Sequence, residues 1–285
     1  VSKNVSRFFG DLIEKHKFPI PFSQVSAAWL YDRFKLEIGR QSTLGYPKGK
    51  RGWEIIGDYA HKNIKGRILT NTSVQQIVIE DGIVTKIVLP GETIKLTKDD
   101  IVVCGLPPYI ITKLATGLPE GLTDKLNSID YAANICVVIG TDENLTDYYW
   151  INTIGDYPFG TIIGQNTLYG DGEFPWKVYY ISTYCDKDDQ QMKMSDEDLF
   201  KLYMKHIEKI FNRKIDVKWF KVNRTPVGGA IEKVGLMDKI PTNDELINLK
   251  FAGQYMTYPK ERSTGETIMS GRNAVRKFME KPKTT

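Results

Sequence analysis

The fold is decided by two stretches near the end of the chain, Leu249–Gln254 (LKFAGQ) and Gly265–Val275 (GETIMSGRNAV). The first is a short apolar run that ends in a glycine, and the second opens on a glycine and carries small residues at helical spacing. With the polar loop between them, they predict a strand, a loop and a helix. The free N–H groups and the positive dipole end of such a helix favour an anionic group. An ordinary strand–helix crossover packed through glycine would give the same pattern.

A second informative block lies far upstream and begins with the glycine-rich loop Gly45–Gly49 (GYPKG). Residues 53–60 predict a helix. Leu69–Glu80 is rich in β-branched residues and predicts a strand, and Asp81-Gly82 predicts a hairpin turn into the alternating residues 83–89. The block therefore runs as a loop, a helix and an antiparallel meander.

The same block closes on Ile101–Leu106 (IVVCGL), an apolar run without alternation. Such a run is typical of a strand that is buried on both faces of a parallel sheet. Pro107-Pro108 stops it, because proline cannot continue a sheet ladder. Helix, meander and buried strand thus precede the closing strand and helix in a fixed order.

In this order the two blocks resemble the superfamily of FAD-dependent amine oxidases, phytoene desaturases and protoporphyrinogen oxidases, whose closing helix points at the flavin pyrimidine ring. The middle third resembles the substrate domain of oxidoreductases similar to protoporphyrinogen oxidase and UDP-galactopyranose mutase. The segments that carry this second likeness are Tyr149–Asn152, Pro158–Gly160, Ile162–Thr167 and Tyr179–Ile181. Gly164-Gln165 stands where some relatives have an acidic–histidine pair, so an inherited acid–base role is not expected there.

The resemblance implies that FAD is the cofactor and that both blocks contact it. Val74 would meet the adenine through its main chain, and Gln254 replaces an acidic residue that commonly follows the alanine–glycine pair. Lys260-Glu261-Arg262 resembles an acidic–arginine loop beside the flavin, although Glu261 and Arg262 could instead pair with each other. The full set of implied cofactor-binding residues is Gly45, Pro47, Gly49, Val74, Gly253, Gln254, Gly265, Thr267 and Ile268.

A substrate cavity is expected from aromatic residues and one arginine, namely Tyr46, Trp150, Tyr157, Phe159 and Arg224. Core packing explains the aromatic residues equally well, and a surface ion pair is the common fate of an arginine such as Arg224. The sequence names no catalytic residue. In flavin chemistry the cofactor carries the hard step, and the protein supplies orientation, exclusion of water and local charge.

The superfamily begins with a G-x-G-x-x-G turn that lets the backbone approach the FAD pyrophosphate, and no such turn occurs in this sequence. The chain also opens at Val1 in an amphipathic segment. We therefore expect an N-terminal segment that is missing here or is supplied by a second polypeptide, and weak or absent FAD binding by this chain alone. The alternative is a non-catalytic chain that uses the scaffold without flavin.

Composition excludes several other classes of protein. Of the 285 residues, 41% are apolar and 26% charged, as in a globular cytoplasmic protein, and no apolar stretch approaches the ~20 residues of a membrane span. Three cysteines and three histidines lack ligand-like spacing, so neither a metal site nor a disulfide framework is expected. The net charge of +4 is mild, and no nucleic-acid-binding signature accompanies it.

The expected fold combines α/β and α+β parts: a partial Rossmann-like FAD-binding domain interwoven with a mixed-sheet substrate domain. Residues 1–44 would form a helical part of the substrate domain, and residues 45–108 the FAD-domain portion with the meander. Residues 109–225 would form the main substrate domain, in which Ser195 caps a long helix. Residues 226–285 would cross back and supply the closing strand and helix.

Two classes of function remain open. The first is an FAD-dependent oxidoreductase, similar to amine oxidases and desaturases, that acts on a small or isoprenoid-like substrate; within it, a redox-neutral sugar-nucleotide mutase is the alternative. The second is a non-catalytic fragment that does not hold FAD alone. The expected partners are a small-molecule substrate and the missing segment, and a homodimer is left open.

Overall fold

The computed structural model describes residues 3–37, 52–169 and 174–279. The glycine-rich loop with Gly45, Tyr46, Pro47 and Gly49 lies outside the described residues. The chain divides into two compact units that alternate along the sequence. Unit 1 comprises residues 1–24, 40–67 and 132–228, and unit 2 comprises residues 25–39, 68–131 and 229–285. The four domain segments expected from the sequence remain predictions.

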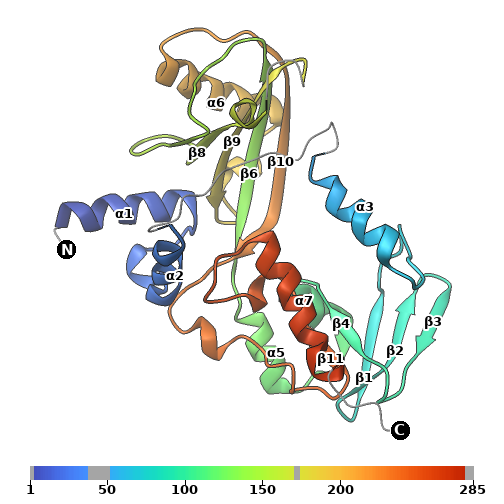
Figure 1. The fold of residues 1–285 in the computed structure, drawn as a ribbon. Coiled ribbons are helices and arrows are strands. Elements are labelled where there is room, and N and C mark those ends of the chain that lie inside the picture. Colours follow the sequence, from blue (N-terminus) through green and yellow to red (C-terminus); the bar gives the residue numbers. More distant parts are fainter. Residues whose placement is uncertain (1–2, 38–51, 170–173, 280–285) are drawn as a thin grey trace. The chain divides into compact units, whose positions relative to one another are not determined.

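Unit 1 is built on a five-stranded sheet in the order β10-β6-β9-β8-β7, with α6 packed on one of its faces (Figure 1). Strands β6 and β9 pair antiparallel from Ala133↔Cys185 to Thr141↔Lys177. The elements of this unit are α1 (Lys3–His16), η1 (Phe22–Gln24), α3 (Glu54–Asn63), β6 (Tyr131–Thr141), β7 (Trp150–Asn152), β8 (Thr161–Gly164), η2 (Gln165–Leu168), β9 (Lys177–Cys185), η3 (Gln190–Met192), α6 (Asp196–Phe211) and β10 (Val217–Ala230).

The core of unit 1 forms between α6 and the sheet. Leu199, Tyr203 and Ile207 recur along one face of α6 and are buried against alternate residues of β6 and β9. The capping box predicted for this helix is confirmed: the Ser195 hydroxyl oxygen accepts the N–H of Asp198 at 3.1 Å and donates to its carboxylate at 2.8 Å. Both the start of the helix and its buried face therefore follow from local sequence.

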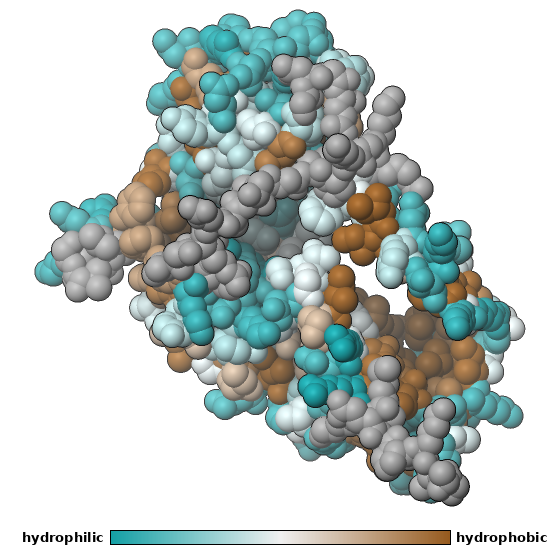
Figure 2. Space-filling view, viewed as in Figure 1, coloured by the Kyte–Doolittle hydropathy of each residue, from teal (hydrophilic) through white to brown (hydrophobic). Residues whose placement is uncertain are grey.

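Helix α3 was expected at residues 53–60 and is found at Glu54–Asn63, but it buries none of its residues. Ile55 and Ile56 are exposed on its surface, where apolar side chains are visible in Figure 2.

Unit 2 contains a four-stranded sheet in the order β3-β2-β1-β5 and a two-stranded parallel sheet, β11-β4 (Figure 1). Its sheets are thus partly antiparallel and partly parallel. The elements are α2 (Ala27–Glu37), β1 (Gln76–Glu80), β2 (Ile83–Leu89), β3 (Glu92–Lys95), β4 (Val102–Cys104), α4 (Pro108–Leu114), β5 (Ala115–Thr116), α5 (Glu120–Asn127), η4 (Leu236–Asp238), β11 (Leu249–Phe251), η5 (Gln254–Met256) and α7 (Thr264–Met279).

The predicted hairpin is confirmed, since Asp81 and Gly82 both have positive φ and join the pair Glu80↔Ile83. The strand predicted from Leu69 is wrong in its first half, because β1 begins only at Gln76. The polar residues before it include Asn71 in the left-handed conformation (φ 54°), which interrupts an extended chain.

A buried asparagine ties the antiparallel meander of unit 2 to its parallel pair. Asn248, directly before β11, accepts the N–H of Val84 at 2.7 Å and donates to the carbonyls of Val84 and Thr97, each at 3.0 Å. Every polar group that the side chain brings into the core is thus used. This fixes where β11 starts relative to β2.

The parallel pair differs from the expectation of a strand buried on both faces. Only Val102–Cys104 form β4, and Ile101 and Val103 are 38% and 42% exposed. Val102 and Cys104 hydrogen-bond toward β11, so the main chain of Val103 points to the other side of β4. Nothing in the described parts of the chain pairs with β4 on that side. The side chains of Ile101 and Val103 are exposed for a second reason: they share one face of the strand, and the described residues leave that face uncovered. Across the described ranges, no helix combines the length and apolar character needed to cross a membrane.

Candidate functional site

The carboxyl ends of β4 and β11 lie side by side and end in glycine. Phe251 is in register with Cys104, and Ala252 donates its N–H to the Cys104 carbonyl at 2.9 Å. The next residue, Gly253, has φ 124°, a conformation that favours glycine. A Cβ atom placed on it would lie 3.6 Å from the carbonyl oxygen of Gly105. Ligands of α/β folds bind at such carboxyl ends of parallel strands.

The closing helix α7 contacts this end through its second turn. Gly253 donates its N–H to the hydroxyl of Ser270, on the buried side of α7, at 2.9 Å. The predicted sequence of strand, loop and helix is therefore confirmed, and the loop contains the short helix η5.

The free N–H groups at the start of α7 are partly satisfied by nearby groups of the chain itself. Ser263 accepts the N–H of Glu266 at 3.1 Å, and its carbonyl accepts both the N–H and the hydroxyl of Thr267. The Glu266 carboxylate itself lies in the first turn and pairs with Lys260 at 3.0 Å. The anionic group expected at this helix start is thus supplied in part by the chain. Gly265 and Ile268 are exposed there, and their contact with a cofactor stays a prediction.

Val74 lies two residues before β1 and is half-buried against the core of unit 2. The next residue, Gln75, already donates its N–H to Val88. Among the described residues, no hydrogen bond is recorded to the main chain of Val74 itself. An adenine contact through these main-chain groups therefore remains a prediction.

Gln254 and Arg262 converge on the end of β10. Gln254 accepts the N–H of Ala230 at 3.2 Å, and Arg262 donates to the Ala230 carbonyl at 2.7 Å. A Cβ atom on Gly229 would lie only 2.0 Å from the guanidinium of Arg262, so a larger residue here would displace this guanidinium from its place beside β10.

The sequence raised a pairing of Arg262 with its neighbour Glu261, and the ion pairs found among the described residues are different ones. Arg262 approaches Glu232 at 3.8 Å, with both side chains only 2% exposed. Glu261 instead pairs with Arg33 at 3.7 Å, and its N–H donates to Asp32. Sequence reasoning missed this buried pair because its two members are far apart in the chain and neither lies in a recognisable motif.

The residues predicted to line a substrate cavity are only partly brought together. Trp150 is 50% exposed on β7, where its indole N–H donates to Asn152 at 2.6 Å. Arg224 donates to the Met194 carbonyl at 2.9 Å and pairs with Asp196. These contacts fit the structural alternative considered for Arg224, and a substrate role for either residue remains a prediction. Tyr46 lies outside the described residues.

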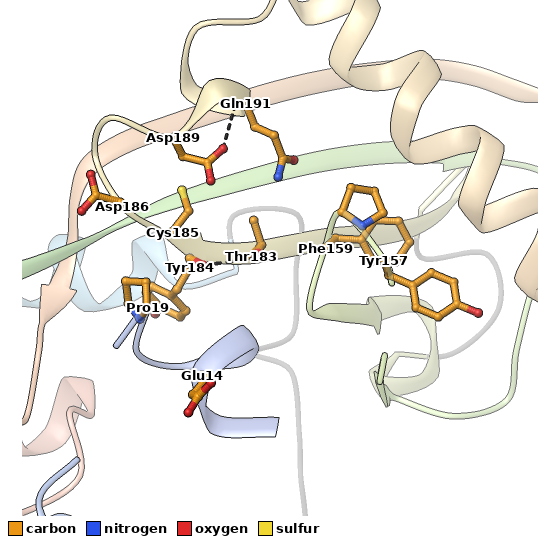
Figure 3. A pocket seen from close by; sticks show the side chains of 11 residues that line it. Glu14, Pro19, Tyr157, Phe159, Thr183, Tyr184, Cys185, Asp186, Asp189 and Gln191 are labelled. Carbon is orange, nitrogen blue, oxygen red and sulfur yellow. Dashed lines mark hydrogen bonds between the residues drawn. The ribbon is translucent and has the colours of Figure 1, made fainter. Parts of the chain in front are cut away.

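Tyr157 and Phe159 do share a cavity of about 350 Å³ within unit 1 (Figure 3). Phe159 is 1% exposed and packs on Tyr203, with ring centroids 5.1 Å apart, so it belongs to the core as well. Sequence reasoning missed the acidic residues of this cavity, because Glu14 lies far along the chain from Asp186 and Asp189. The lining residues are Glu14, Pro19, Tyr157, Pro158, Phe159, Thr183, Tyr184, Cys185, Asp186, Asp189 and Gln191.

The three cysteines are free thiols. Burial raises the pKa of Cys136 to about 11. The pKa of Cys185 rises to about 12, first through burial and then through the negative charges of Asp189 and Asp186. Both groups therefore stay protonated at neutral pH and are poor nucleophiles. In the described part of the chain, no group of acidic, histidine and cysteine side chains could hold a metal ion.

Comparison with known proteins agrees with the geometry of the parallel pair and the closing helix. Residues 8–278 match the family described as flavin-containing amine oxidoreductases. The fold is similar to that of a protein assigned as a protoporphyrinogen oxidase from Exiguobacterium sp. 255-15, with a TM-score of 0.72 and 15% identity over 97% of this chain. It is also similar to reduced UDP-galactopyranose mutase, with a TM-score of 0.73 and 13% identity over 98% of this chain.

An oxidoreductase from Methanosarcina mazei matches 74% of this chain, with a TM-score of 0.55 and 16% identity. No match was found among curated protein sequences. The chain spans 62% of the length of the Exiguobacterium protein and 66% of that of the mutase. At such identities the structural matches establish the fold alone, and the family match establishes membership: the chain belongs to the flavin-containing amine oxidoreductase family.

Proposed function

We propose that this chain forms the substrate-binding part and the closing half of the cofactor site of an FAD-dependent oxidoreductase that acts on a small or isoprenoid-like substrate. The observation that carries the proposal is the pair of parallel strands that ends in Gly105 and Gly253, in a chain whose family is flavin-containing. When bound, FAD would supply the redox chemistry, by accepting electrons from the substrate. The chain's own residues would hold one end of the cofactor and the substrate.

The residues present fit part of FAD. Two adjacent glycine positions leave the carboxyl ends of β4 and β11 without side chains, and Gly265 leaves the exposed start of α7 open. The main chain of Val74 offers a donor and an acceptor for the adenine. The chain is less suited to the FAD pyrophosphate than to these other parts of the cofactor. The sequence has no G-x-G-x-x-G turn to donate backbone N–H groups, and Glu266 places a negative charge in the first turn of α7.

A further polypeptide segment would complete this site. On the outer side of β4, the main chain of Val103 has no strand partner among the described residues, and the apolar side chains of Ile101 and Val103 are exposed. An unpaired strand of this kind is a template for another strand. The outer side of β11 is different, because Phe251 donates its N–H there to the side chain of Asn243 at 2.6 Å. We therefore place the strand of the G-x-G-x-x-G segment beside β4.

The test is a titration of FAD, followed by quenching of its fluorescence, against the chain alone and against the chain joined to the segment that carries the G-x-G-x-x-G strand. We expect weak or no binding by the chain alone and stoichiometric binding by the completed protein. A tight complex with the chain alone would remove the need for the segment. Failure of the completed, folded protein to bind FAD would overturn the flavoenzyme assignment.

A further inference from the structure

Unit 1 contains a second cavity, which shares no lining residue with the one beside Tyr157. Its volume of about 520 Å³ lies within the range of small-molecule sites, roughly 300–1,000 Å³. Every side chain that lines it carries a polar group, and its two charged residues, Asp147 and Lys177, have opposite signs. The cavity therefore suits a polar ligand without a net charge.

The loop after β6, which lines this cavity, is held in place by a buried tyrosine. Tyr179 of β9 is 0% exposed, and its hydroxyl accepts the N–H of Leu145 at 2.8 Å and donates to the side-chain oxygen of Asn144 at 3.2 Å. Asn166 donates to the same oxygen at 3.2 Å, and Arg213 donates to the main-chain carbonyl of Asn144 at 2.7 Å. The amide of Asn144 is therefore fixed in one orientation.

The same loop presents hydrogen-bonding groups that the described residues leave unused. Asn144 donates one of its two amide N–H groups to Asp147 at 2.7 Å, and among the described residues the other N–H has no acceptor. Asp147 accepts this single bond and forms no ion pair within the described ranges. The hydroxyl oxygen of Thr146 accepts the N–H of Tyr148 at 3.1 Å, so its own O–H can still donate. A donor and an acceptor thus lie side by side, as two neighbouring hydroxyl groups of a ligand would require.

Tyr169 adds an aromatic ring to the lining of the cavity. This ring packs on Phe174, with ring centroids 4.6 Å apart. The negative face of an aromatic ring attracts the slightly positive C–H groups of a saturated ring. A charged ligand of either sign would meet a like charge in Asp147 or Lys177, whereas a hydroxyl group both donates and accepts and so matches the mixed lining.

We propose that this cavity binds a cyclic polyol, such as a monosaccharide. One hydroxyl group of the ligand would accept the remaining N–H of Asn144, and its neighbour would donate to the carboxylate of Asp147. The C–H face of the ligand ring would pack on Tyr169. The proposal rests on unit 1 alone and goes beyond the oxidoreductase reaction proposed above, because it does not depend on flavin binding.

The test is a titration followed by saturation-transfer NMR of the ligand signals. The chain is titrated with myo-inositol and the methyl glycosides of glucose, galactose and mannose, and separately with cyclohexanol, which keeps a six-membered ring but has a single hydroxyl group. We expect saturable binding of at least one polyol and at least roughly tenfold weaker binding of cyclohexanol, because the alcohol cannot use the donor and the acceptor together. If no polyol of this set binds saturably, or if cyclohexanol binds equally well, the proposal is overturned without any variant.

Two variants locate the binding in this cavity. Asp147→Ala removes the acceptor and should weaken binding of the tightest polyol roughly tenfold, and Thr146→Val, which keeps the shape of the side chain, should weaken it severalfold. The matched control is Asp142→Ala, because this carboxylate of the same unit pairs with Lys218 outside the cavity. The control should bind like the unchanged chain, and thermal unfolding shows whether each variant is folded. Unchanged affinity in both folded variants, or an equal loss in the control, would refute the site.

Discussion

The five-stranded sheet of unit 1 and the parallel pair of unit 2 differ in how complete they are. Strands β6 and β9 share nine registered pairs, and their inner face is sealed by α6. Strands β4 and β11 share three pairs, and no other described strand pairs with the outer side of β4. Isolated two-stranded sheets have little stability of their own. The comparison teaches that the sheet of unit 1 is covered on one face by its own helix, whereas the parallel pair of unit 2 leaves one side of β4 unpaired in the described part of the chain, as our proposal of a further strand requires.

The largest effect on stability is expected from a substitution that creates a cavity in the core of unit 1. Phe159→Ala removes a ring that is 1% exposed and should lower the free energy of unfolding by about 3–5 kcal/mol in urea denaturation. The matched change on the open strand, Val103→Ala, should cost less than about 1 kcal/mol, because that side chain is already 42% exposed. Similar losses in both variants would mean that the two regions are not different in packing.

The start of α7 distinguishes a cofactor site from a plain crossover. In the protein completed with the G-x-G-x-x-G segment, Gly265→Asp should abolish FAD binding while folding persists, because it adds a side chain and a negative charge at an open helix start. Gly271→Asp, in the same helix, has equal room for a side chain and serves as the control. The measurement is the flavin content of the purified variants. Unchanged flavin content in Gly265→Asp would mean that α7 has only a structural role.

Val74 allows a finer test of the same region. Val74→Ala should cost on the order of 1 kcal/mol, because the side chain is only half-buried, and should leave FAD affinity unchanged. Val74→Pro removes the backbone N–H and should lower FAD affinity beyond what its loss of stability explains. Thermal unfolding and FAD titration of the completed protein would measure both. Equal affinity in the two folded variants would exclude Val74 from the site.

The smallest effect is expected in how the stability of unit 1 depends on pH. The pKa of Cys185 is raised from 9.0 to about 12, so the buried thiol stays neutral in the folded state. The stability that this neutral thiol contributes is fully present below about pH 9. It is lost as the pH rises toward 12, because in that range the thiol ionises in the unfolded chain but not in the folded one. Cys185→Ala should therefore show a shallower alkaline fall in thermal midpoint than the unchanged chain. Parallel curves would contradict this assignment.

Local signals in the sequence predicted the local parts of the fold. Asp81-Gly82 predicted the hairpin, Ser195 with Asp198 predicted the start of α6, and the run ending at Gly253 predicted the closing strand. Each of these depends on residues close together in the chain. The same signals misplaced the start of β1, because composition alone did not reveal the left-handed Asn71.

The candidate sites depended on contacts between distant residues, and these left little trace in the sequence. The carboxylates of Glu14 and Asp189 share a cavity although α1 and the end of β9 are far apart in the chain. Arg262 forms its buried ion pair with Glu232, which lies on a different segment of the chain from its neighbour Glu261. Val103 and Ile101 lie on a face of β4 that the described residues leave exposed, and an apolar run cannot reveal this. Periodicity reports which face is apolar, not what covers it.

The most direct test of the open strand is amide hydrogen exchange at β4, measured on the chain alone and on the protein completed with the G-x-G-x-x-G segment and FAD. The N–H of Val102 already donates to Asn248 at 2.8 Å and serves as an internal reference. We predict that the N–H of Val103 exchanges fast in the chain alone and becomes strongly protected in the completed protein. Protection of Val103 already in the chain alone, or no change on completion, would contradict the account.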